Sequence, residues 1–144
     1  MSEAIRPIAL AIVRRTAEIL VFEAFDSVKK QRFHRPLGGG IEFGERAADA
    51  VARELLEETG SEVRVDRLLG VLENVFTHEG RPGHEIVFVF EVELLDPSIA
   101  ERDELEIVEV IGGEEVRIRG VWVDPARLET PLYPDGLLGL LVSC

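Results

Sequence analysis

The stretch GGGIEFGERAADAVARELLEETG, residues 38–60, decides the fold, because a run of glycines leads directly into a helical pattern. The pattern predicts a helix over Glu45–Thr59, and Gly60 is well placed to end it. Alanines inside this segment favour a helix and allow close packing on a sheet; they are Ala47, Ala48, Ala50 and Ala52. The sequence therefore predicts a helix that packs on a sheet and follows a tight glycine turn.

Three carboxylates crowd the last turns of this predicted helix. At about 100° per residue, Glu54, Glu57 and Glu58 fall on one patch. Repulsion costs about 0.2–0.5 kcal/mol per i,i+4 pair, and the helix dipole adds about 0.3–1 kcal/mol. A bound hard cation, Mg2+ or Mn2+, would relieve this repulsion. A solvated acidic face, screened by Arg53, is the alternative that the spacing alone leaves open.

The glycine run before the helix also has two interpretations. Glycines commonly mark a flexible turn, but they also let backbone atoms approach a metal or a phosphate without an intervening Cβ. The run is not a phosphate-binding P-loop, because no Lys–Ser/Thr pair follows it. The glycines and the carboxylates together favour a binding site over a simple acidic surface.

A fixed series of residues connects the glycines to the carboxylates: Gly39, Glu45, Arg53, Glu54, Leu55, Glu57, Glu58 and Gly60. This series resembles the box of the Nudix hydrolases, G-x5-E-x7-R-E-U-x-E-E-x-G-U, in which U is a bulky aliphatic residue. Ser61 departs from the pattern at the final position, where the family usually packs an aliphatic side chain. The departure affects a packing expectation and leaves the proposed chemistry intact. The later segment GVWVDPARL also looks like this family.

The resemblance implies an α/β fold, a Nudix-type α/β/α sandwich around a mixed β-sheet. It also implies hydrolysis of a nucleoside diphosphate linked to another moiety. In this chain, Glu54, Glu57 and Glu58 would ligate one or more Mg2+ ions, with Mn2+ as the alternative metal, and the backbone carbonyl of Gly38 would complete the site. Arg53 would hold the glutamates by an ion pair. Glu45 would orient the helix and the loop.

The resemblance leaves the general base open, because some members use a box glutamate and others a residue from a later loop. Glu54 is the first candidate, and the acidic region Glu101–Glu115 is the alternative source of the base. A Nudix-fold module that binds a nucleotide without turnover is the alternative function, although the intact box glutamates favour an enzyme. A prenyl diphosphate isomerase would need a cysteine in the cleft, and the chain's only cysteine is Cys144.

The composition agrees with this hypothesis. A length of 144 residues, 46% of them hydrophobic, predicts one globular domain over residues 1–144. The net charge of −12 disfavours a nucleic-acid polymer as partner, and metal ions would have to bridge the protein to an anionic small molecule. The apolar runs are too short to span a membrane, and the N-terminus lacks a signal-peptide pattern, so a cytoplasmic location is expected. The apolar C-terminal segment is consistent with a homodimer.

The remaining elements are predicted from periodicity. Residues 8–15 and 18–25 suggest a hairpin, and residues 25–40 read as a loop or a short irregular strand. The chain then predicts an interrupted strand over 62–76, a clear strand over 84–95, an acidic loop with a weak strand over 96–115, a strand over 116–123, a helical turn at 124–129 and a short helix over 134–142.

Overall fold

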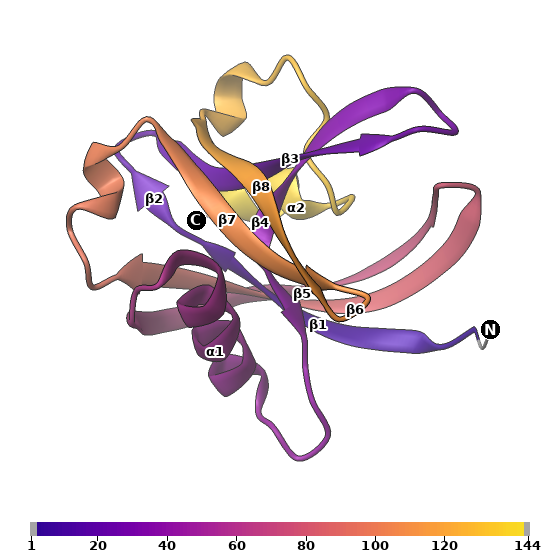
Figure 1. The fold of residues 1–144 in the computed structure, drawn as a ribbon, viewed down its shortest axis with the longest axis horizontal. Helices are drawn as coiled ribbons and strands as arrows, with labels where there is room; N and C mark the ends of the chain where they lie inside the picture. The colour runs from indigo at the N-terminus through magenta and orange to yellow at the C-terminus, as the bar shows by residue number, and fades with distance from the viewer. Residues whose placement is uncertain (1–2, 143–144) are drawn as a thin grey trace.

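The computed structural model describes residues 3–142. Its strands are β1 (Ile5–Ile12), β2 (Arg14–Arg15), β3 (Glu18–Asp26), β4 (Gln31–Gly40), β5 (Val63–His78), β6 (Arg81–Leu94), β7 (Glu104–Ile111) and β8 (Glu114–Val123). Its helices are α1 (Ala47–Thr59) and α2 (Leu137–Val142), with 3-10 turns η1 (Ile99–Glu101) and η2 (Pro125–Arg127). These strands form one sheet in the order β5-β6-β1-β4-β3-β8-β7, with β2 paired to β3 (Figure 1).

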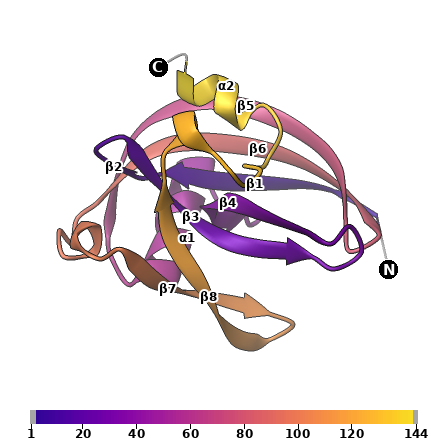
Figure 2. The same cartoon turned by 90° about the horizontal axis from the view of Figure 1, so that it is seen from above.

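The sheet is mixed and carries a helix on each side. Strands β1 and β6 run parallel, whereas the other neighbours along this path run antiparallel. Figure 2 shows α1 and α2 on opposite sides of β1 and β6. Each helix covers a separate hydrophobic core. Val51 and Leu55 of α1 lie in one buried cluster, and Leu137 and Leu141 of α2 lie in the other. The predicted α/β/α sandwich around a mixed sheet is confirmed.

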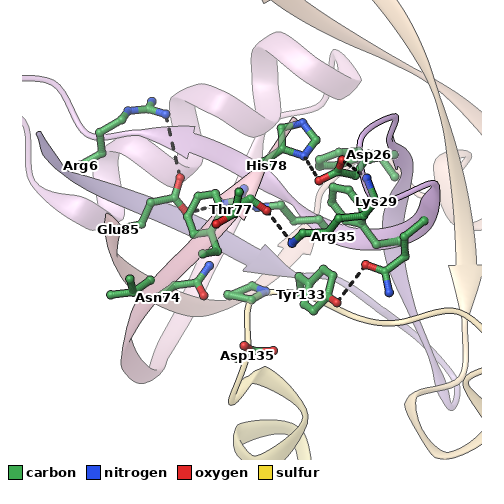
Figure 3. A pocket seen from close by; sticks show the side chains of 17 residues that line it. Arg6, Asp26, Lys29, Arg35, Asn74, Thr77, His78, Glu85, Tyr133 and Asp135 are labelled. Atoms are coloured by element: carbon green, nitrogen blue, oxygen red, sulfur yellow. Dashed lines mark hydrogen bonds and ion pairs between the residues drawn. The ribbon is translucent and has the colours of Figure 1, made fainter. Parts of the chain in front are cut away.

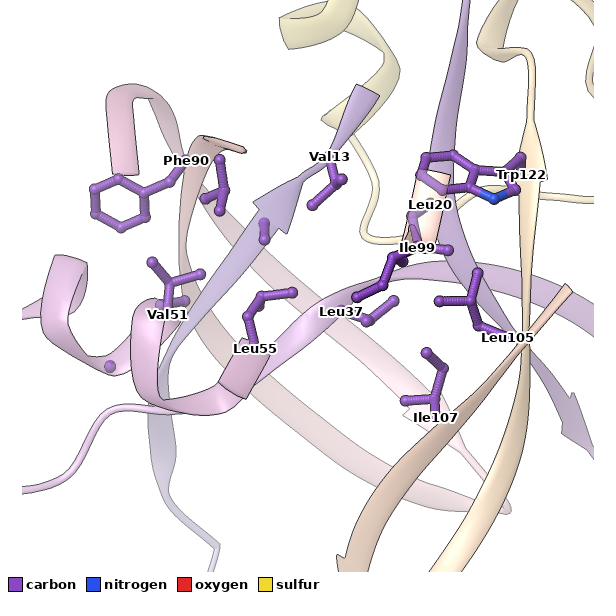
Figure 4. Packing of buried hydrophobic residues seen from close by; sticks show 14 residues of the cluster. Val13, Leu20, Leu37, Val51, Leu55, Phe90, Ile99, Leu105, Ile107 and Trp122 are labelled. Carbon is purple, nitrogen blue, oxygen red and sulfur yellow. The ribbon is translucent and has the colours of Figure 1, made fainter. Parts of the chain in front are cut away.

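The core beneath α1 joins residues that are far apart in the chain (Figure 4). Leu55 is fully buried and packs in one cluster with Leu37 of β4, Ile107 of β7 and Trp122 of β8. The indole N–H of Trp122 donates to the carbonyl of Arg102 at 2.9 Å, so its polar atom is satisfied. This packing fixes the acidic face of the helix relative to both β4 and β7.

The helix α1 begins two residues later than predicted and ends where expected. Glu45 lies in the preceding turn, where its carboxylate accepts the N–H of Glu42 at 3.1 Å. Gly60 adopts a left-handed conformation, with φ of 79°, and its N–H donates to the carbonyl of Leu56. A residue without a Cβ suits that conformation, which is why the helix stops there.

The interpretation of residues 25–40 as a loop or short irregular strand is wrong. Residues 31–40 form β4, a regular strand of ten residues that pairs with β3 along one part and with β1 along the other. The segment lacks an apolar alternation because its first half, from Gln31 to Arg35, is only partly buried. Backbone pairing with two neighbours therefore determines the structure here more than side-chain pattern does.

The predicted N-terminal hairpin is only partly correct. The turn pairs β2 with the start of β3, but β1 pairs with β4 and β6 instead. The strand over 84–95 is confirmed as part of β6. Both faces of its centre are buried, since Val87 and Val89 pack in the cluster with α2 and Phe90 packs in the cluster with α1.

The remaining elements follow the predictions closely. The interrupted strand is β5, whose register shifts between Val65 and Arg67 and again between Leu68 and Gly70. A Cβ at Gly70 would lie 2.7 Å from the Leu140 side chain, so this glycine lets α2 approach the sheet. The weak strand in the acidic region is the eight-residue strand β7, which is longer than expected because it pairs fully with β8.

Other predictions concern the helical turn, the C-terminal helix and membrane spans. The helical turn is confirmed as η2, and the C-terminal helix is confirmed as α2, which begins three residues later than predicted. Among residues 3–142, no helix has the length and apolar character needed to cross a membrane.

Ser61, the departure from the family pattern, is buried without being apolar. Its side chain is almost inaccessible, and its hydroxyl donates to the carbonyl of Glu62 at 2.7 Å. The same oxygen accepts the N–H of Asp96 at 3.1 Å. Hydrogen bonds thus replace the packing that an aliphatic side chain would supply at this position.

Replacing one of two adjacent leucines should show which face of α1 holds the fold. Leu55→Ala should lower the free energy of unfolding by about 2–5 kcal/mol, because it opens a cavity between the helix and the sheet. Leu56, which is 48% exposed, is the matched control; Leu56→Ala should change that free energy by only about 0.5 kcal/mol. Urea unfolding measures both. Equal losses would contradict the described packing.

Candidate active site

The glycines of β4 form the floor beneath the acidic face of α1. Gly38 pairs with Leu10 of β1 and has a φ of 143°. A Cβ there would overlap the carbonyl oxygen of Ala9. At Gly39, a Cβ would lie 2.5 Å from the carboxyl carbon of Glu54. Glycine is required at these two positions because neighbouring atoms approach the backbone so closely. The Glu54 carboxylate of α1 therefore lies against a part of β4 that has no side chains.

Arg53 organises the carboxylates on the solvent side of this contact. Its guanidinium donates to both oxygens of Glu45, at 2.8 and 2.9 Å, and to the carbonyl of Gly40 at 3.0 Å. It also donates to Glu54 at 3.1 Å and to Glu57 at 3.3 Å. Hydrogen bonds from Arg53, together with the N–H of Glu42, lower the pKa of Glu45 to about 2. One cation thus ties the loop, the strand end and the helix together.

Glu58 is the carboxylate least favourably placed in the structure. It is 2% exposed, and one of its oxygens accepts the N–H of Gly38 at 3.0 Å. Its other oxygen, Oε2, is buried and has no hydrogen-bond partner among residues 3–142. Burial, followed by the adjacent Glu109 and Glu54, raises the pKa of Glu58 well above its usual range. A buried, incompletely paired carboxylate is costly, and such groups concentrate at functional sites.

Glu109 joins this cluster from β7. Its carboxyl group interacts with Glu58 and, more weakly, with Glu54. Burial is the main cause of the raised pKa of Glu54. The sequence indicated the region Glu101–Glu115 without separating its members. The pairing of β7 with β8 and the packing of α1 against β7 select Glu109 from that region. Only the tertiary fold carries this information.

Most of the residues predicted for the site therefore lie together. Glu54, Glu57, Glu58, Arg53 and Glu45 surround the end of β4, and Glu57 is the most exposed carboxylate, with 56% of its side chain accessible. Gly38 contacts the cluster through its N–H, which donates to Glu58. The role of its carbonyl as a metal ligand stays a prediction.

The donor set fits a hard cation, although the side chains do not converge on one point as they stand. Within residues 3–142, no group of three His, Cys, Asp or Glu side chains is arranged to hold a metal ion. Arg53 draws Glu54 and Glu57 toward itself, while Glu58 keeps a buried oxygen without a partner. That free oxygen lies beside the carboxyl groups of Glu54 and Glu109, and such a set of oxygen ligands matches the preference of Mg2+ and Mn2+.

Known proteins share the family and the fold of this chain. A family model described as the NUDIX domain matches residues 4–137. The chain belongs to the Nudix family. The solution structure of the ORF135 protein from E. coli is similar, with a TM-score of 0.61 and 22% identity over 98% of this chain and 91% of that one. An ADP-ribose pyrophosphatase from Streptococcus suis gives a TM-score of 0.56 and 18% identity over 97% of this chain and 92% of that one.

A further structural neighbour is larger than this chain. The crystal structure of a UDP-X diphosphatase has a TM-score of 0.64 and 18% identity, covering 99% of this chain and 64% of the other. At these identities the neighbours establish the shared fold, and the family match establishes that the chain is a member of the Nudix family. The cysteine that an isomerase would need, Cys144, lies outside the described residues.

Replacing the buried carboxyl group of Glu58 should stabilise the metal-free protein at neutral pH. Glu58→Gln should raise the free energy of unfolding in the presence of EDTA by about 1–3 kcal/mol, because the buried carboxyl, whose pKa is raised, must take up a proton on folding, whereas an amide is already neutral and can donate to Glu109. Glu57→Gln is the matched control, since the Glu57 side chain is 56% exposed, and should change that free energy by about 0.5 kcal/mol or less. Chemical denaturation measures both. Destabilisation by Glu58→Gln would contradict the strain assigned to this carboxylate.

Proposed function

We propose that this Nudix family member hydrolyses the diphosphate linkage of a small nucleoside diphosphate derivative in a reaction that requires Mg2+, with Mn2+ as a substitute. The observation that carries the proposal is the buried oxygen of Glu58, which has no partner among the described residues and adjoins two further carboxylates. A chain with a net charge of −12 needs bound cations to accept a polyanionic substrate at such a cluster.

In this proposal, Glu54, Glu57, Glu58 and the carbonyl of Gly38 hold the metal. Bound there, Mg2+ would neutralise phosphate charge and lower the pKa of a coordinated water. Arg53 and Glu45 position the ligands. The fivefold hydrogen bonding of Arg53 to the loop, the strand end and the helix supports that role.

The proton of the attacking water is assigned to Glu109. The water oxygen forms a bond to phosphorus, the bridging P–O bond breaks, and a carboxylate accepts the water proton. Glu54 is already engaged by Arg53 and packed on Gly39, whereas Glu109 faces the cluster from a different element. Glu54 remains the second candidate for this base. A cytoplasmic location and a homodimer stay predictions.

Hydrolysis should depend on the metal and on the box carboxylates. A panel of nucleoside diphosphate derivatives, including ADP-ribose, nucleotide sugars and dinucleoside polyphosphates, is assayed for phosphate or nucleotide release with Mg2+ and with EDTA. Glu54→Gln and Glu58→Gln should each reduce turnover more than about 100-fold, because each removes a metal ligand. Mg2+ should also raise the melting temperature of the wild type more than that of Glu58→Gln.

Some outcomes of this panel would contradict the proposal. Turnover that ignores EDTA, or that survives in both variants, would exclude the proposed chemistry. Metal-dependent stabilisation with no turnover on any member of the panel would instead favour a nucleotide-binding module. Circular dichroism spectra of the variants show whether loss of activity comes from the site or from unfolding.

Glu109→Gln should distinguish the role of a general base from that of a metal ligand. If Glu109 accepts the proton, kcat should fall by about 100-fold or more, while the Mg2+-induced rise in melting temperature should remain. Glu106→Gln, on the same strand, is the matched control, because Glu106 pairs with Arg117 and not with the carboxylate cluster. An unchanged kcat would assign the proton transfer to Glu54.

A further inference from the structure

A groove of about 940 Å³ lies where the first residues of β1 meet the hairpin of β5 and β6. Ile5 and Val75 lie on either side of His84 in this groove, because both pair with it across neighbouring strands. Residues that pair in this way point to the same face of a sheet. Ile5 is 59% exposed and Val75 is 69% exposed, so two apolar side chains of this face meet solvent.

The same face continues beneath α1. Pro7 pairs with Ile86 in the next row of the sheet, and Ala9 pairs with Phe88 in the row after that. Ala9 and Phe88 belong to the core that α1 covers, whereas Pro7 is exposed and Ile86 is only half-buried. The apolar face of the sheet therefore extends beyond the helix that covers it. Contiguous apolar surface of this kind marks a site of interaction with another molecule.

Phe43 provides an exposed aromatic side chain close to this groove. It lies in the loop between β4 and α1, and it is fully exposed, more than any other large apolar side chain of residues 3–142. Figure 1 shows this loop projecting away from the sheet. Aromatic residues are enriched at the centres of protein interfaces, where they fill pockets of the partner. Phe43 thus has the features of an anchor for a second protein surface.

The loop of Phe43 begins beside the groove in the same chain. The N–H of Ile41 donates to the carbonyl of Pro7 at 3.0 Å. The Arg6 guanidinium, which lines the groove, lies 3.2 Å from the position that a Cβ at Gly40 would occupy. A protrusion and a groove on one surface satisfy each other when two copies meet about a two-fold axis. The contact is then made twice, which brings the buried area closer to the about 800 Å² per partner of a stable interface.

The loop and the groove carry opposite charges. Glu42 precedes the aromatic anchor; its side chain is 72% exposed and lies 4.0 Å from Arg53. In the groove, the Arg6 side chain is 64% exposed and lies 4.0 Å from Glu85, the only residue to which a dashed line connects it in Figure 3. Because Glu85 is already paired with Arg35 at 2.9 Å, the Arg6 guanidinium can bind a second carboxylate. Glu42 of another copy supplies such a carboxylate.

The groove is less acidic than the chain as a whole. Arg6 and Arg81 line it beside Glu3 and Glu85, whereas the whole chain has 28 acidic and 16 basic residues. Two copies with a net charge of −12 repel each other least where such a balanced surface meets an acidic loop. A nucleic acid or an anionic membrane would need an excess of basic residues, and the arginines of this lining are matched by carboxylates.

We propose that two copies of this chain form a two-fold dimer through this surface. Phe43 of each copy inserts into the groove of the other, against Ile5 and Val75, and Glu42 forms an ion pair with Arg6 of the other copy. The dimer buries the apolar end of the sheet and the exposed aromatic ring together. It requires neither a metal ion nor turnover, so the proposal does not depend on the hydrolase activity.

The C-terminal segment, the other candidate for a dimer contact, is largely used within its own chain. Leu137 and Leu141 are buried in the core under α2. Leu138 and Val142 remain exposed, at 42% and 76%. Substitutions can therefore distinguish the two surfaces.

Size-exclusion chromatography with light scattering measures the molar mass of the full chain over a range of concentrations. The wild type should approach twice the 16.0 kDa of one chain. Phe43→Ser should weaken association by about 100-fold or more, because each dimer loses two aromatic anchors. Leu138→Ser is the matched control, since it removes an exposed apolar side chain of α2, and it should leave the dimer intact. Thermal unfolding shows that each variant is folded.

A pair of charge reversals tests the arrangement across the two-fold axis. Arg6→Glu and Glu42→Arg should each dissociate the dimer, because like charges face each other twice in each homodimer. An equimolar mixture of the two variants should restore the mass of a dimer, since both ion pairs form again between unlike copies. This restoration cannot come from a change in the stability of either variant.

Four outcomes would overturn the proposal: a wild type that stays monomeric up to sub-millimolar concentration, a dimer that survives Phe43→Ser, a dimer that Leu138→Ser dissociates, or a mixture of the charge variants that stays monomeric. A mass that keeps rising with concentration would indicate an open assembly and would also overturn it. Failure of the hydrolase proposal looks different. A dimer without turnover leaves this inference intact, whereas a monomer with metal-dependent turnover removes it and leaves the hydrolase proposal standing.

Discussion

The close approach of α1 to the end of β4 is the constraint on which the rest of the structure depends. Glu58 is buried against the N–H of Gly38, and Glu54 occupies the space that a side chain at Gly39 would fill. This arrangement forces carboxylates out of water beside one another, which costs free energy in the absence of a compensating charge. Arg53 compensates the negative charge of Glu54 and Glu57 only. The buried Oε2 of Glu58 has no hydrogen-bond partner among the described residues.

The sheet is built so that this contact can be held rigidly. Strand β4 lies between β1 and β3; β3 pairs with its first part, and β1 pairs with its last part and so fixes the glycines in place. Leu55, one residue from Glu54 and three from Glu58, is fully buried in the core beneath α1. Hydrophobic burial of Leu55 therefore offsets the electrostatic strain at Glu54 and Glu58, its neighbours on the same helix. Natural proteins accept local strain at functional sites in this way.

The sequence predicted the local part of this arrangement well. Spacing placed Glu54, Glu57 and Glu58 on one patch of a helix, and Gly60 marked the end of that helix correctly. The ten-residue strand β4 was missed, because it is specified by its neighbours and not by apolar alternation. Glu109 was hidden for a related reason: within a uniformly acidic region, only the pairing of β7 with β8 and its contact with α1 decide which carboxylate turns inward.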